Sequence, residues 1–213
     1  MISEPGENLE MGTDALGQPA WRVALLYPRQ GSWTEADYLG LEGGPLVEFD
    51  DGVVEVLEMP TKEHQRIAQF LYRWLYAYVL SRDLGEVFLA PLPIQLWQGK
   101  FREPDVFFVR SGREEHLGYP VGADLVIEVV SSDRESRRRD TVVKRSEYAR
   151  AGIAEYWIVD PEFEQIEVLV LGEDRESYRL HGQFVSGQTA SSGTLTELAI
   201  AVDDVLESAR VGS

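Results

Sequence analysis

Two short apolar runs, PDVFFVR at 104–110 and DLVIEVV at 124–130, constrain the fold more than any other feature of this 213-residue sequence. Neither run alternates polar with apolar residues, as a strand with one solvated face would. Both are rich in the β-branched or aromatic residues that strands favour. The pattern predicts two neighbouring strands in the middle of a sheet, buried on both faces.

Two longer segments predict the helices that cover such a sheet. From Thr61 to Gly85 apolar residues recur at the spacing of one helix face, with Thr61 as the N-cap and Gly85 after the end. The segment 136–153 predicts a second helix that stops at Gly152, and 155–161 predicts the next strand. Strand, helix and strand in this order form the βαβ unit of a mixed central sheet flanked by helices, so the expected fold class is α/β (α+β).

Shorter elements are expected around this core. The stretch SWTE opens a short helix that Ser32 or Thr34 caps, that runs through Leu41 and that ends at Gly43 and Gly44. The remaining elements are a hairpin that turns at Asp51 and Gly52, strand-like runs at 86–97, 165–171 and 178–185, and a terminal helix near 202–209.

The chain length fits one domain of ordinary size. Residues 1–31 are expected to form a flexible arm, because its beginning is rich in Gly, Glu and Asp without a hydrophobic period, and residues 32–213 a single domain. No stretch approaches the roughly 18 apolar residues of a membrane span, and the acidic start differs from a secretory signal. A cytoplasmic protein without membrane contact is therefore expected. The absence of cysteine excludes disulfides and thiolate metal sites.

A net charge of −17 argues at first against a polyanionic partner. The charge is unevenly distributed, however: the window 134–150 carries +4 and the remainder −21. A basic segment in an acidic protein favours contact with nucleic-acid phosphates, although a well-solvated helix face stays an equal alternative. The arginines that we expect to contact nucleic acid are Arg137, Arg138, Arg139 and Arg145.

Two carboxylates interrupt the apolar runs. Asp105 stands at the start of VFFV, and Glu128 stands inside LVIEVV. An uncompensated charge in such surroundings costs several kcal/mol, and two carboxylates on neighbouring strands also repel each other. A hard divalent cation with oxygen ligands removes both penalties. The pair therefore predicts a Mg²⁺ site, which Mn²⁺ could also occupy, at which a phosphoryl group can be attacked by water.

A cationic group to orient that water is the missing part of the site. Lys144 shares a helix face with Asp140 and Tyr148, a mixed stripe that looks inward as much as outward. Because its helix follows the strand of Glu128, it can pack over the sheet and direct Lys144 to the Asp105–Glu128 pair. A lysine that extends to solvent is the alternative. Asp140, four residues earlier, can form an ion pair with Lys144.

The order Pro104-Asp105 and then Glu128 resembles the signature of PD-(D/E)XK nucleases. That signature usually places a lysine two residues after the glutamate, and here the position holds Val130. A larger pattern is similar to the Uma-type family of restriction-endonuclease-like proteins, a domain of unknown function, from about residue 33 to about residue 205. Its motifs in this chain are VEFDDGVVEVLEMPTKEH, REPDVFFV, LVIEVVSSD and DTVVKRSEYARAGIAEYWIVDP.

The resemblance implies a restriction-endonuclease-like core, Mg²⁺-dependent hydrolysis of phosphodiester bonds in DNA, and a homodimer. In this family the lysine has moved onto the following helix. Two details depart from the family pattern, Val53 after the hairpin turn and SSD after the Glu128 strand, and neither removes a site residue. The implied site consists of the metal ligands Asp105 and Glu128 with the carbonyl of Val129, the catalytic lysine Lys144, and the further residues Glu48 and His64.

Each of the weaker assignments has a structural alternative. His64 lies on the side of Ile67 and Leu71, so a core-facing histidine with a satisfied hydrogen bond is equally expected. Glu48 could be an exposed hairpin residue, and Tyr148 is expected in the core.

Two other function classes stay open at this point. The nuclease fold could serve an inactive module that binds nucleic acid or a protein partner. Paired carboxylates could also serve a glycosidase as acid and base.

Overall fold

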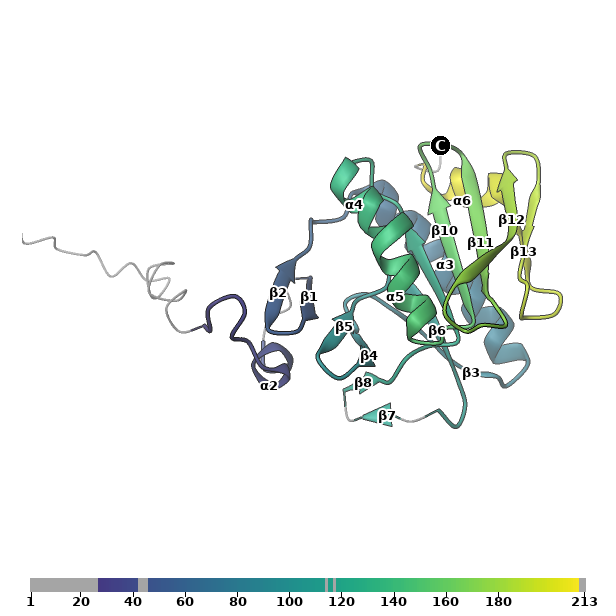
Figure 1. The fold of residues 1–213 in the computed structure, drawn as a ribbon. Coiled ribbons are helices and arrows are strands. Elements are labelled where there is room, and N and C mark those ends of the chain that lie inside the picture. Colours follow the sequence, from purple (N-terminus) through teal and green to yellow (C-terminus); the bar gives the residue numbers. More distant parts are fainter. Residues whose placement is uncertain (1–26, 42–45, 114, 117, 211–213) are drawn as a thin grey trace, which may run out of the picture.

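The computed structural model describes residues 27–41, 46–113, 115–116 and 118–210. Its centre is a six-stranded sheet in the order β12-β11-β10-β9-β6-β3, in which β9 and β10 run parallel and the other neighbours antiparallel (Figure 1). The mixed α/β fold class is confirmed. The strands are β3 Gly85–Leu89, β6 Val106–Arg110, β9 Leu125–Val129, β10 Glu155–Asp160, β11 Gln165–Leu171 and β12 Tyr178–Val185.

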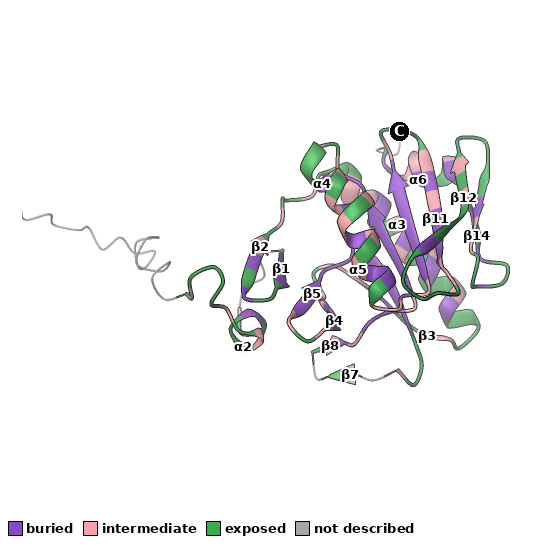
Figure 2. Ribbon diagram, in the orientation of Figure 1, coloured by how far each residue is buried: buried purple, intermediate pink, exposed green. Residues whose placement is uncertain are grey.

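The two apolar runs form β6 and β9, which lie side by side in the sheet interior and are buried on both faces, as Figure 2 shows. Successive side chains of β9 alternate between two cores. Ile127 and Val129 pack with helix α3 Lys62–Ser81, whereas Val126 packs on the other face with Tyr148. Glu128, between them, belongs to the second face.

That second face is covered by the segment between β9 and β10, which completes the predicted βαβ unit. The segment is helical throughout but not uniform: α4 Arg134–Arg138 and α5 Arg145–Arg150 are joined by a π-helical stretch η1 Arg139–Lys144. Gly152 follows with φ of 75°, as expected for the residue that stops the helix. A continuous α-helix was predicted, and the wider turn at η1 is a difference from that prediction.

A second, four-stranded sheet has the order β2-β1-β5-β4, with β1 Val47–Asp50, β2 Val53–Val56, β4 Ile94–Trp97 and β5 Lys100–Arg102. The hairpin β1–β2 turns at Asp51 and Gly52, both with positive φ, as the sequence predicts. The predicted run at 86–97 is not one strand. It splits into β3 and β4, which belong to different sheets, because Pro91 and Pro93 interrupt the ladder between them.

The short helix α2 Glu35–Leu39 packs Tyr38 on Phe49 and Phe101 of the second sheet. Thr34 caps it through a reciprocal contact with Asp37. The predicted extension through Leu41 is wrong, since Gly40 is the C-cap; Gly43 and Gly44 lie outside the described residues.

Most of the predicted arm, residues 1–26, lies outside the described residues. Within its described part, the Gln30 side chain forms hydrogen bonds with the backbone of Val54.

The terminal helix α6 Val202–Ser208 contacts α3. Within the described ranges no helix is long and apolar enough to cross a membrane. The remaining strands are β7 Glu115–His116, β8 Tyr119–Pro120, β13 Thr189–Ser191 and β14 Ala199–Ala201.

Candidate active site

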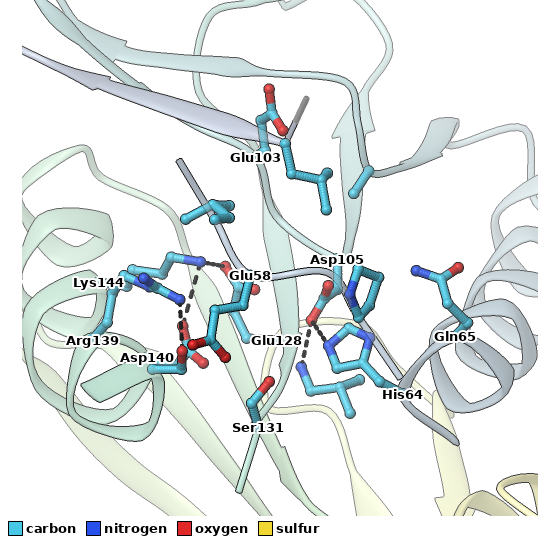
Figure 3. Close-up of a pocket in the computed structure, with 16 residues that line it drawn as sticks. Glu58, His64, Gln65, Glu103, Asp105, Glu128, Ser131, Arg139, Asp140 and Lys144 are labelled. Carbon is cyan, nitrogen blue, oxygen red and sulfur yellow. Dashed lines mark hydrogen bonds and ion pairs between the residues drawn. The ribbon is translucent and has the colours of Figure 1, made fainter. Parts of the chain in front are cut away.

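A small cavity of about 60 Å³ lies where β6, β9, α3 and η1 meet (Figure 3). Asp105 and Glu128 both line it, so the structure brings together the two carboxylates of the apolar runs. Its charged lining comprises the acids Glu58, Glu103, Asp105, Glu128 and Asp140, the cations Arg139 and Lys144, and His64.

Asp105 immediately precedes β6 and is held by two donors on one oxygen. The Val129 amide donates to Oδ2 over 2.7 Å, and His64 Nε2 lies 3.1 Å from the same atom. Burial raises the pKa of Asp105, but His64 and the Val129 amide lower it by more, so the net shift is downward. Asp105 is therefore an anion whose Oδ2 is fixed.

His64 reaches Asp105 from the first turn of α3. Thr61 caps this helix by accepting the His64 backbone N–H, which fixes where the imidazole starts. Burial lowers the pKa of His64, and the contact with Asp105 raises it by more, so the net shift is upward. The ring is partly buried, as the core alternative expected, but its hydrogen bond goes to a site residue.

Glu128 is also bonded on one oxygen only. Lys144 Nζ at 2.9 Å and the Tyr148 hydroxyl at 2.6 Å both donate to Oε1. Burial raises the pKa of Glu128 most, Lys144 opposes this, and Asp105 and Asp140 add to it, so that the net pKa is about 8. The residue thus holds a proton more readily than an ordinary glutamate does.

Lys144 does not extend to solvent: its side chain is 4% exposed. Besides Glu128, its Nζ lies 3.3 Å from Glu48 and 3.3 Å from Asp140, so the pair with Asp140 expected from the spacing forms. Burial lowers the pKa of Lys144, and the three carboxylates raise it by more, well above its usual value. The ammonium is therefore charged at neutral pH.

Glu48 lies on β1 and is completely buried, contrary to the exposed-hairpin alternative. Its carboxylate contacts Arg102 Nη1 at 2.5 Å and accepts the Glu103 amide at 3.3 Å. Burial raises the pKa of Glu48, and Lys144 and Arg102 lower it by more. Glu48 thus forms an ion pair between strand β1 of the four-stranded sheet and the ammonium of Lys144.

A family model described as "Uma2: Putative restriction endonuclease" matches residues 35–203. The chain belongs to the Uma2 family. The resemblance expected from the sequence motifs is thereby confirmed.

A solved structure has the same fold as this Uma2 chain. It is the crystal structure of a "putative nuclease belonging to DUF820" from Anabaena variabilis, with a TM-score of 0.69 and 19% sequence identity over 84% of this chain and 99% of that one. No curated protein matches the chain significantly.

The place of the lysine in this Uma2 protein has a structural reason. Val130, at the position where PD-(D/E)XK nucleases usually have lysine, is buried in the core beneath α5 with Tyr148 and Ala149. Val130 thus contributes to apolar packing, and Lys144, on the helical segment that covers the same face of β9, supplies the ammonium instead. The π-helical stretch η1 begins and ends with residues of the site cavity, as such stretches often do at functional sites.

Three site neighbours were not predicted as such. Arg102 donates to both oxygens of Glu147, over 2.8 and 2.9 Å, as well as to Glu48. Glu103 lines the cavity with one buried oxygen unpaired, and burial together with Glu48 raises its pKa to about 8. Tyr148 is in the core, as expected, but its hydroxyl binds Glu128. Only Tyr148 had a sequence signal, since it lies four residues after Lys144.

The four arginines expected to contact nucleic acid are not brought together. Arg139 lines the site cavity, whereas Arg137 is paired with Asp160 and Glu162. Arg138 is exposed, and Arg145 lines a separate cavity of about 370 Å³.

The donor set suits a divalent cation held by oxygen ligands. Among the described residues, none donates a hydrogen bond to Asp105 Oδ1 or to Glu128 Oε2, while the other oxygen of each carboxylate is fixed. Across the described ranges no three His, Asp or Glu side chains form a metal-binding group. A cation here would thus have two carboxylate ligands, with backbone and water completing its shell, as Mg²⁺ commonly does.

Proposed function

We propose that the protein is a Mg²⁺-dependent endonuclease that hydrolyses phosphodiester bonds of DNA. Family membership supports a nuclease. The observation that carries the finer proposal is the single cavity that contains Asp105, Glu128 and the charged Lys144. Asp105 and Glu128 would hold Mg²⁺, or Mn²⁺ in its place, through their unbonded oxygens, with the carbonyl of Val129 as a further ligand. The bound ion would lower the pKa of a water molecule and neutralise charge on a phosphoryl oxygen.

Lys144 serves as a fixed positive charge beside the reacting phosphate and not as a general base. A general base must be able to lose its proton near the working pH, and three carboxylates hold the pKa of Lys144 far above that range. A fixed ammonium instead stabilises the negative charge that develops on the phosphate and orients the attacking water. Glu48 and Asp140 fix its direction.

His64 acts through Asp105. Its Nε2 is occupied by the Asp105 carboxylate, so the ring orients that carboxylate and partly balances its charge. At metal sites, a residue that does not itself bind the ion commonly orients a ligand in this way through a hydrogen bond. The unpaired His64 Nδ1 is not needed for this role.

The test is a substrate panel for the wild-type protein: supercoiled plasmid, single-stranded DNA, RNA and a chromogenic glycoside, each with Mg²⁺, with Mn²⁺ and with a chelator. The proposal expects nicking or linearisation of DNA that stops when the metal is chelated. Binding of DNA without any cleavage would favour an inactive binding module. Hydrolysis of glycosides in the presence of chelator would favour the glycosidase alternative.

A further inference from the structure

Of the lysine and arginine side chains that line the site cavity, within the described part of the chain, only Arg139 keeps an unpaired donor. Lys144 has three carboxylate partners. Arg139, by contrast, places Nη2 3.0 Å from Ser136 Oγ and Nη1 3.1 Å from Glu55, while its buried Nε has no partner. A purely structural link between helix and hairpin explains these two contacts. It does not explain why the buried Nε–H is left without an acceptor.

The partner of Arg139 lies at the edge of the second sheet. Glu55 is on the edge strand β2, directly opposite Glu48 on β1, and Arg102 Nη1 contacts both carboxylates, at 2.5 Å from Glu48 and 3.7 Å from Glu55. The side chain of Glu55 is 44% exposed, compared with 17% for Arg139. The ion pair is therefore accessible from solvent on the Glu55 side, and the Glu55 carboxylate can leave without uncovering the core.

We propose that Arg139 binds a phosphate of the nucleic-acid backbone beside the reacting bond, and that the Glu55 carboxylate occupies this position until the substrate arrives. Carboxylate and phosphate oxygens accept the same guanidinium donors, so a phosphate at Nη1 would take the place that the Glu55 carboxylate holds. Glu55 thus acts as an internal competitor of the substrate. The inference rests on the proposed function, since it supplies the phosphate contact of that site.

A double-mutant cycle tests the exchange. Binding of a fluorescent DNA duplex is measured in chelator, where no cleavage occurs, for Glu55→Gln, Arg139→Gln and the double variant; kcat and KM are measured with Mg²⁺. Glu55→Gln should bind about two- to fivefold more tightly, as expected for release of an exposed ion pair. Arg139→Gln should bind about ten- to a hundredfold more weakly. In the double variant the gain from Glu55→Gln should vanish.

Two controls isolate the contact from net charge and from folding. Glu86→Gln removes one acidic charge from the exposed face of another edge strand, β3, and Arg73→Gln removes one exposed basic charge from α3; both residues lie outside the site cavity. Arg139→Lys keeps the positive charge but not the several N–H donors of the planar guanidinium. It should therefore recover only part of the DNA affinity that Arg139→Gln loses. Thermal unfolding of every variant checks the fold.

The outcomes separate this inference from the proposed function. If Glu55→Gln tightens binding equally in the wild-type background and in the Arg139→Gln background, or if Arg139→Gln binds as the wild type does, the exchange is wrong although the nuclease proposal can stand. If the wild type neither binds nor cleaves nucleic acid, both proposals fall.

Discussion

At the scale of single residues, the site depends on carboxylates that each use one oxygen for the protein and leave the other unbonded. Glu128 illustrates the consequence. Its bonds from Lys144 and Tyr148 orient it, yet burial still raises its pKa to about 8. A carboxyl group in this state binds a proton and a cation in competition.

We therefore expect the Mg²⁺ affinity to depend on pH. As the pH falls below about 8, a growing fraction of the Glu128 carboxyl groups carries a proton that must leave when the cation binds, so the affinity should fall by up to about tenfold per pH unit. Calorimetric titrations in buffers of different ionisation enthalpy would measure both the affinity and the proton release. An affinity that stays constant between about pH 6 and about pH 8 would show that Glu128 is not a ligand or is already ionised.

A second residue-scale prediction concerns Arg102. Its replacement by Met leaves the buried Glu48 and the half-buried Glu147 without their guanidinium, and removal of one partner from a buried ion pair costs about 3–5 kcal/mol. Urea unfolding would measure the loss. Arg82→Met is the matched control, because the Arg82–Glu197 pair is exposed and should cost at most about 1 kcal/mol. If both variants lost the same free energy of unfolding, the ion pairs of Arg102 with Glu48 and Glu147 would not stabilise the protein as buried pairs do.

The sequence predicted part of this site and not the rest. Asp105 and Glu128 could be predicted because a charge in an apolar run is locally visible, and Lys144 because it shares a helix face with Asp140. Arg102 could not be predicted, since it meets Glu48 across 54 positions and Glu147 across 45 positions, and no local pattern encodes such pairings.

At the scale of elements, long periodic segments were predictable. The helix α3, with its cap at Thr61, and the neighbouring strands β6 and β9 follow directly from hydrophobic period and cap residues. The π-helical stretch η1 does not, because its residues have the same helical pattern as their neighbours and only tertiary contacts select the wider turn.

The π-helical stretch yields a prediction of its own. Deletion of the exposed Val142 should convert η1 to a regular α-helical turn and rotate Asp140 and Lys144 relative to each other. Cleavage should be lost while the circular dichroism spectrum keeps its helical signal. The substitution Val142→Ala, which keeps the residue count, is the control and should retain activity. An active deletion variant would mean that η1 does not position the lysine.

At the scale of the whole molecule, the charge of −17 opposes both DNA binding and self-association. The homodimer implied by the family resemblance would join two acidic chains, so salt should strengthen it by screening their repulsion. Sedimentation velocity at low and high salt, over a range of protein concentrations, measures this. DNA binding should respond in the opposite direction and weaken as salt rises. A sedimentation coefficient that corresponds to a monomer at every concentration and salt level would contradict the dimer.

The most direct test of the account measures metal binding and DNA cleavage on the same samples of wild type, Asp105→Asn, Glu128→Gln and Lys144→Met. We predict that the two carboxylate variants lose both Mg²⁺ affinity and cleavage of supercoiled plasmid. Lys144→Met should still bind Mg²⁺ but cleave at least about a hundredfold more slowly, the usual effect of removing one group that stabilises the charge of a transition state. Cleavage that survives Lys144→Met, or Mg²⁺ binding that survives both carboxylate substitutions, would contradict the assignment of this cavity as the active site.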